Sequence, residues 1–284
     1  MLYIVIAIIL FSFNNVLWKK NLKGSNVFFL VTYRAFFTSS FALLIAFFFY
    51  SETALYVDDF IKITSGSALG ALGLFCMLTV IKSKSLQWIG IYNLVGIAFT
   101  AIYLWVFEKI DISKTLIGVG ITVVGFIFYV FSSLNSNIKI TLKHHLILLV
   151  MVLCFTLSSL IHWENLVNEI PPVFIIANQE LVVFILGFTI AFYKRDDFKI
   201  HTLLKNQFHA VLVMGGVIFF ALVCSFMGLK IVNPLISGLV FLVNPLTTIL
   251  FSAIFFKESI SIKNWLSISI ISLGAFIIYL QTLQ

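Results

Sequence analysis

The chain has 284 residues, of which 61% are hydrophobic and only 10% are charged, and it contains 32 phenylalanines. Soluble domains carry roughly 45–50% apolar and about 25% charged residues, so a soluble fold of this length would expose large apolar patches. The composition therefore predicts an integral membrane protein. A spanning helix needs about 20 apolar residues and a short loop adds roughly eight, so the chain has room for about ten spans.

The net charge of +7 does not indicate nucleic-acid binding, because the basic residues are scattered over short loops without a basic patch. The sequence contains no metal-ligand cluster, phosphate loop or cofactor motif, and its three cysteines lie in apolar runs without metal-binding spacing. The five histidines lie in loops or at span ends, so no Ser-His-Asp set can be assembled. We expect neither a cofactor, nor a metal, nor a catalytic residue.

Ten apolar segments follow one another along the chain, and none has the two-residue alternation of a β-strand. The first lacks the basic start and cleavage site of a signal peptide and ends against Trp18, Lys19 and Lys20, so we interpret it as a spanning helix. The longest connections are too short to be domains and cover residues 50–65, 134–144 and 194–208. The ten predicted spans are residues 2–18, 27–49, 66–81, 86–107, 112–133, 145–161, 173–193, 209–229, 235–256 and 264–281.

The second half of the chain repeats the first at a separation near 150 residues, since residues 108–130 align with 258–280. The alignment pairs Glu108 with Glu258 and Tyr129 with Tyr279, and a weaker register places Val27 over Val173. We predict an all-α membrane protein with two five-helix halves, residues 1–134 and 140–284. Because five is odd, the second half enters the membrane in the opposite sense. Such inverted repeats are common in secondary transporters, whose substrate site lies at the repeat interface.

The basic residues in the loops predict the membrane orientation. Loops after odd-numbered spans hold thirteen Lys and Arg residues, those after even-numbered spans hold four, and Arg34 is the remaining one. The positive-inside rule then places the odd loops in the cytoplasm and both termini outside a plasma (inner) membrane.

The end of each half resembles EamA-type members of the drug/metabolite transporter superfamily. The resemblance is carried by Asn244-Pro245, by the turn from Phe256 to Ser261 and the following run to Tyr279, and by Glu108 in the first half. Arg34 also stands where the family often has an arginine in its second helix. The resemblance implies a ten-helix transporter that exports small molecules, with cytoplasmic termini in common family members. The loop charges of this chain predict the opposite orientation.

Two ionisable residues lie deep inside predicted spans, where a charge costs about 2.5–3.5 kcal/mol on insertion scales. Arg34 and Glu180 are equivalent in the weaker repeat register and enter from opposite faces of the membrane. The functional interpretation is a central charged pair, or an anion-recognising arginine beside a protonatable glutamate. Desolvation favours the neutral carboxyl form, as proton coupling through Glu180 would require. The structural alternative is that Arg34 clamps carbonyl groups or snorkels, while Glu180 balances its charge.

Several polar residues lie on the helices that enclose the cavity in the family. Hydrogen bonds between helices are the alternative explanation for each of them. Pro245 removes a hydrogen bond one turn earlier and is a candidate gating hinge or a static kink. The predicted substrate-binding set is Asn14, Asn15, Arg34, Tyr92, Asn93, Asn178, Gln179, Glu180 and Asn244.

These features favour a secondary transporter that moves a small metabolite, amino acid or amphipathic compound by alternating access, with the lipid bilayer as its surroundings. Two other classes stay open. One is a structural or regulatory membrane subunit, and the other is an intramembrane enzyme acting on lipid, which would need a His, Asp or Ser cluster at one interface. Two fused halves can form a complete site alone, so a monomer is plausible and the oligomeric state is open.

Overall fold

The computed structural model describes residues 1–21, 27–53, 55–82, 86–109, 113, 116–133, 141–193, 200–257 and 262–282. Within these ranges all eleven regular elements are α-helices and no strand occurs. The helices are α1 (Leu2–Asn21), α2 (Val27–Phe49), α3 (Val57–Lys82), α4 (Leu86–Val106), α5 (Leu116–Ser133), α6 (Leu142–Val167), α7 (Pro172–Tyr193), α8 (Ile200–Ile231), α9 (Pro234–Phe241), α10 (Asn244–Phe256) and α11 (Ile262–Thr282).

Three helices extend well beyond the predicted apolar segments, so the predicted boundaries there were wrong. Helix α3 begins at Val57, because Asp58 and Asp59 in its first turn favour a helix N-terminus and the Asp59 carboxylate accepts a hydrogen bond from the Tyr56 backbone N–H at 3.2 Å. Helix α6 continues through Val167, and α8 begins at Ile200, inside the predicted 194–208 connection. Apolarity marks the bilayer core, whereas hydrogen bonding and caps determine where a helix ends.

The predicted ninth span, 235–256, is divided into α9 and α10. Leu242 and Val243 form a turn between them, and the Val243 carbonyl accepts from the backbone N–H groups of Leu246 and Thr247 at 3.0 Å each. Pro245 has no N–H, so the Phe241 carbonyl loses its helical donor. Proline therefore lies in the first turn of a new helix, where its missing donor is tolerated.

The helices are long and apolar enough for a multi-pass membrane protein. Among the described residues, six helical runs satisfy the length and composition of a membrane span, and the run Pro234–Phe256 counts α9 and α10 together. Four shorter apolar helices lie in α1, α4, α5 and α11. Large apolar side chains also cover the outside, and Phe47, Phe48 and Phe49 are 70%, 70% and 77% exposed. Such a surface requires lipid rather than water as its solvent.

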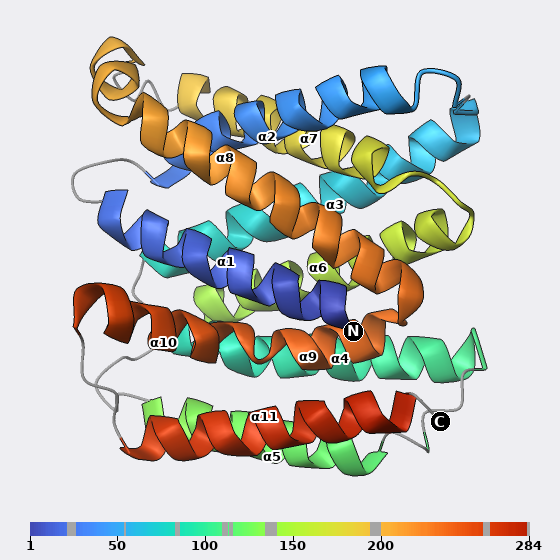
Figure 1. The fold of residues 1–284 in the computed structure, drawn as a ribbon, viewed down its shortest axis with the longest axis vertical. Helices are drawn as coiled ribbons and strands as arrows, with labels where there is room; N and C mark the ends of the chain where they lie inside the picture. The colour runs from blue at the N-terminus through green and yellow to red at the C-terminus, as the bar shows by residue number, and fades with distance from the viewer. Residues whose placement is uncertain are drawn as a thin grey trace.

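The helices lie side by side and run across the view in Figure 1, with both chain termini at the same end of the bundle. Helix α2 packs against α7 and α8, α3 packs against α6 and α7, and α1 packs against α8 and α10. Helices α5 and α11 pack together as an outer layer, below α4, α9 and α10 in Figure 1. One hydrophobic cluster joins this layer to α1, α4 and α9, and another joins α2, α3, α6, α7 and α8.

Candidate functional site

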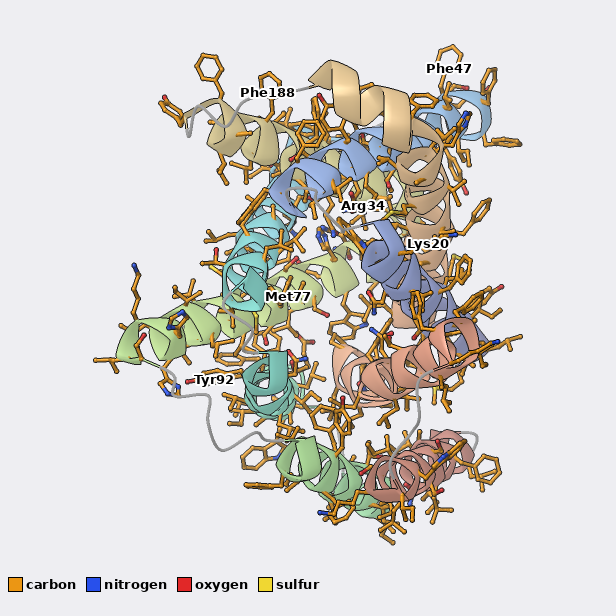
Figure 2. All side chains as sticks on the ribbon, turned by 90° about the vertical axis from the view of Figure 1, so that its left-hand side faces the viewer. Lys20, Arg34, Phe47, Met77, Tyr92 and Phe188 are labelled. Carbon is orange, nitrogen blue, oxygen red and sulfur yellow. The ribbon has the colours of Figure 1, made fainter. Side chains whose placement is uncertain are left out.

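An ion pair links α2 to α7 inside the bundle. Arg34 Nη2 lies 2.9 Å from Glu180 Oε2, and the two side chains are 7% and 4% exposed. Figure 2 shows Arg34 directed into the bundle, whereas Phe47 and Phe188 project outward. By hydrogen-bond geometry Glu180 Oε2 has no partner in the described part of the chain, so its contact with Arg34 is described as an ion pair. That oxygen still has the capacity to accept a hydrogen bond.

Close packing of small residues brings the three helices around this pair together. A Cβ atom on Gly187 of α7 would lie 2.1 Å from the Thr32 hydroxyl oxygen of α2, so only glycine permits the observed approach. The Thr38 hydroxyl lies 3.0 Å from the Arg34 carbonyl and 3.1 Å from the Gly215 carbonyl of α8. Thr38 therefore links α2 to α8 one turn from Arg34.

Asn178 and Gln179 precede Glu180 on α7 but face α3. Asn178 Nδ2 donates to the Thr64 hydroxyl at 3.1 Å, while its Oδ1 is buried without a hydrogen-bond partner among the described residues. Gln179 is half-buried, and its Cδ atom lies 4.0 Å from the position of a Cβ on Gly70. Of these three consecutive polar residues of α7, Asn178 and Gln179 thus lie at the interface with α3, whereas Glu180 pairs with Arg34 of α2.

A second polar interface joins α1 to α10 where the ninth span is divided. Ser12 Oγ donates to the Asn244 side-chain oxygen at 2.8 Å and also contacts the Thr247 hydroxyl. Asn15 Nδ2 donates to the Thr248 hydroxyl at 3.1 Å on the exposed side of α1. Asn15 and Asn244 therefore make hydrogen bonds between helices, which was the alternative interpretation. Ser12 was not predicted, because a lone serine carries no signal until its partner is known.

The remaining predicted residues belong to α1, α4 and α10 rather than to α2 or α7. Asn14 is 3% exposed, and its Oδ1 has no hydrogen-bond partner within the described ranges. The Tyr92 hydroxyl lies 3.1 Å from His145 Nδ1 near the beginning of α6, and Asn93 is half-buried on α4. The side chain of Pro245 lies outside the described residues, although its backbone belongs to α10.

One histidine lies elsewhere than the sequence predicted, and a buried asparagine that was not predicted as a site residue lies one turn away from it. His162 was expected at the end of a span or in a loop, but it lies inside α6 and is 2% exposed. Asn165, one turn further along α6, is 0% exposed. Neither His162 ring nitrogen and neither polar atom of the Asn165 amide has a hydrogen-bond partner in the described residues. Their position depends on the extension of α6 beyond the apolar segment, which the hydropathy pattern does not reveal.

Comparison with known proteins agrees with this architecture. Residues 142–280 match the model of the EamA-like transporter family. Residues 142–280 are therefore a domain of the EamA-like transporter family, within the drug/metabolite transporter superfamily. The whole chain is similar to a solved structure titled "Crystal structure of protein", with a TM-score of 0.77 and 12% identity over 98% of this chain and 96% of that one. That likeness concerns the fold alone, and a comparison with curated proteins gave no match.

Proposed function

We propose that the chain is a secondary transporter that moves a small solute by alternating access between its two five-helix halves. Membership of a transporter family supports the class, and the observation that carries the mechanism is the buried Arg34–Glu180 ion pair. An ionisable residue inside a membrane bundle is costly, and it is by default a candidate for a solute or ion pathway. On this proposal the protein is not an enzyme.

The pattern of helix contacts supports an inverted repeat of residues 1–134 and 140–284. Exchanging the halves maps α1, α2 and α3 onto α6, α7 and α8, α4 onto α9–α10, and α5 onto α11. Under this exchange the α1–α8 contact corresponds to the α3–α6 contact, and the α2–α8 contact corresponds to the α3–α7 contact. All four of these helix pairs are in contact in the structure. The pairs α2–α7 and α5–α11 map onto themselves. Left-handed residues also follow α4 and α10, at Lys109 and Lys257.

On this proposed symmetry, Arg34 and Glu180 lie near the axis that relates the halves. Each belongs to the second helix of its half, and the two helices pack directly on each other. Sites of inverted-repeat transporters lie near this axis, where rocking of one half against the other changes access. We propose that a solute competes for the pair, accepting hydrogen bonds from Arg34 and donating to Glu180. Other candidate residues then line the route of the solute towards the ion pair. They are Asn14, Tyr92, Asn93, Gln179 and Asn244.

Proton coupling through Glu180 and gating at Pro245 are parts of the same proposal. A carboxylate that alternates between a guanidinium partner and a proton links solute release to a proton gradient. The division between α9 and α10 removes helical hydrogen bonds at one level and provides a place for bending. The proposed location is the plasma (inner) membrane with both termini outside, as the loop charges predict, and the proposed direction is export.

The test is solute flux in proteoliposomes, screened over amino acids, nucleosides and cationic dyes with and without a pH gradient. We expect saturable flux of at least one class, and loss of that flux in Arg34→Gln. A matched control is Thr189→Ala, because Thr189 lies on α7, is exposed and bonds only within its own helix in the contacts observed. Flux that survives Arg34→Gln would contradict the role of the pair. Failure of every solute would favour the structural or regulatory subunit.

A further inference from the structure

Two ion pairs tie helices together at the end of the bundle that carries both chain termini in Figure 1. Lys62 Nζ of α3 lies 2.9 Å from Glu164 Oε1 of α6. Lys230 near the end of α8 contacts Glu169 in the turn between α6 and α7. All four side chains are substantially exposed to the surroundings, so each pair adds little stability and can open readily.

The turn that carries Glu169 is held in a conformation that favours glycine. Helix α6 ends in a Schellman motif, in which the Ile170 N–H donates to the Asn165 carbonyl and the Glu169 N–H donates to the Leu166 carbonyl. Glu169 has a φ of 63°, in the left-handed region. Glycine adopts this conformation without strain, yet the chain has glutamate, whose carboxylate reaches Lys230. The strained position is therefore explained by the ion pair across the turn.

Below these ion pairs, α3 and α6 pack in a continuous antiparallel register. Gly66, Gly70 and Gly73 of α3 face His162, Ser158 and Phe155 of α6 in turn. A Cβ atom on Gly66 would lie 2.8 Å from His162 Cε1, so the imidazole fills the space that this glycine leaves. The same register places Asn165 opposite Ile63, at the level of the neighbouring Lys62–Glu164 pair. The ion pair and Asn165 thus share one level of this helix interface, and His162 lies about one turn deeper.

This interface contains a concentration of buried polar atoms without partners. Both ring nitrogens of His162 and both amide atoms of Asn165 have no hydrogen bond to any described residue. Buried polar groups are normally satisfied, so each exception requires a reason. An interface that served only for packing would be more stable with apolar side chains of similar size. An interface that water enters in another conformation of the protein needs polar side chains.

The depths of these groups connect the end of the bundle to the Arg34–Glu180 level. At 1.5 Å per residue, Asn165 lies about 3 Å and His162 about 8 Å in from the end of α6. On α7, which starts at the same end, Asn178 lies about 9 Å and Glu180 about 12 Å in. Polar groups therefore occur at each successive level from the surface ion pairs to the buried pair.

We infer that the α3–α6 interface is one of the two gates of the transporter, closed in this structure, with Lys62–Glu164 and Lys230–Glu169 as its latch. When the latch opens, water and solute reach Asn165 and His162, which then gain their missing hydrogen bonds. The inference rests on the alternating-access proposal and specifies where one access path runs. On the orientation predicted from the loop charges, this gate faces the outside.

Thiol labelling tests the gate without any solute. In a background with Cys76, Cys154 and Cys224 replaced by serine, Asn165→Cys reports access to water through its reaction with a membrane-impermeant methanethiosulfonate. Leu166→Cys is the matched control, because Leu166 is also 0% exposed, is adjacent on α6 and belongs to an apolar cluster. We expect Glu164→Gln to raise the labelling rate of Asn165→Cys at least tenfold and to leave Leu166→Cys unchanged.

A charge reversal separates the latch from a general loss of packing. The double variant Lys62→Glu with Glu164→Lys retains an ion pair, so it should restore the slow labelling of Asn165→Cys. Equal acceleration at both cysteines, no acceleration at either one, or fast labelling in the charge reversal would each overturn the gate. Because no solute is involved, such a result would leave the flux experiment, and with it the transporter proposal, to be decided separately.

Discussion

Replacement of the Arg34–Glu180 pair by apolar side chains separates its contribution to stability from its contribution to transport. At 2.9 Å the attraction between unit charges is roughly 6 kcal/mol at an effective dielectric constant of about 20. Removing each ion from water costs several kcal/mol. The net contribution of the pair to the free energy of unfolding is therefore near zero. The double variant Arg34→Met with Glu180→Met should therefore fold with little change in stability.

The single variants should behave unequally. Glu180→Met leaves a buried guanidinium that stays charged, and we expect it to lower the free energy of unfolding by about 3–5 kcal/mol. Arg34→Met should cost less, because the carboxyl group left behind can become neutral by binding a proton.

The assay is the midpoint of thermal aggregation in detergent, followed by size-exclusion chromatography, with flux measured on the same preparations. Glu180→Met should lower the midpoint by on the order of 10 °C, and the double variant should stay near the native value but lack flux. A double variant as unstable as Glu180→Met would refute the energetic reasoning. A stable double variant with native flux would show that the pair is only structural.

Three further substitutions test individual contacts. Gly187→Ala should destabilise the α2–α7 contact by about 1–3 kcal/mol through overpacking against the Thr32 hydroxyl, and thermal midpoints should show at least partial rescue by Thr32→Ala. Ser12→Ala should lower stability by about 1 kcal/mol, since it leaves the side-chain oxygen of Asn244 without the hydrogen bond from α1; an unchanged midpoint would contradict this. Glu169→Gly should raise stability by about 1 kcal/mol by relieving the left-handed backbone, and a lower midpoint would mean that the ion pair outweighs the strain.

The membrane class and the approximate positions of the spans could be predicted, because the partitioning of apolar residues into lipid is a local property of each segment. Helix boundaries were predicted less well. The Tyr56–Asp59 hydrogen bond starts α3 within a polar segment, and a Schellman motif ends α6 beyond its apolar run. The division of the ninth span was foreseen as a kink at Pro245 and occurs as two separate helices.

Among the site residues, Arg34 and Glu180 could be singled out because an ionisable residue inside an apolar run is conspicuous without knowledge of its neighbours. The packing of α2 against α7 then brings their side chains to 2.9 Å. His162 and Asn165 could not be found in this way. Their burial depends on α6 packing against the glycines of α3, a contact between segments about 90 residues apart.

The amino-acid sequence alone thus determined the solvent, the approximate positions of the apolar helices and the two charges that need an explanation, since each follows from the free energy of placing one segment in lipid. Only the tertiary structure decided which polar groups meet. Arg34 pairs with Glu180, Ser12 with Asn244 and Lys62 with Glu164. The polar atoms of the buried His162 and Asn165 side chains have no hydrogen-bond partner among the described residues. The physical reason is that hydrophobicity acts on each segment separately, whereas pairing depends on the register of helices that are distant along the chain.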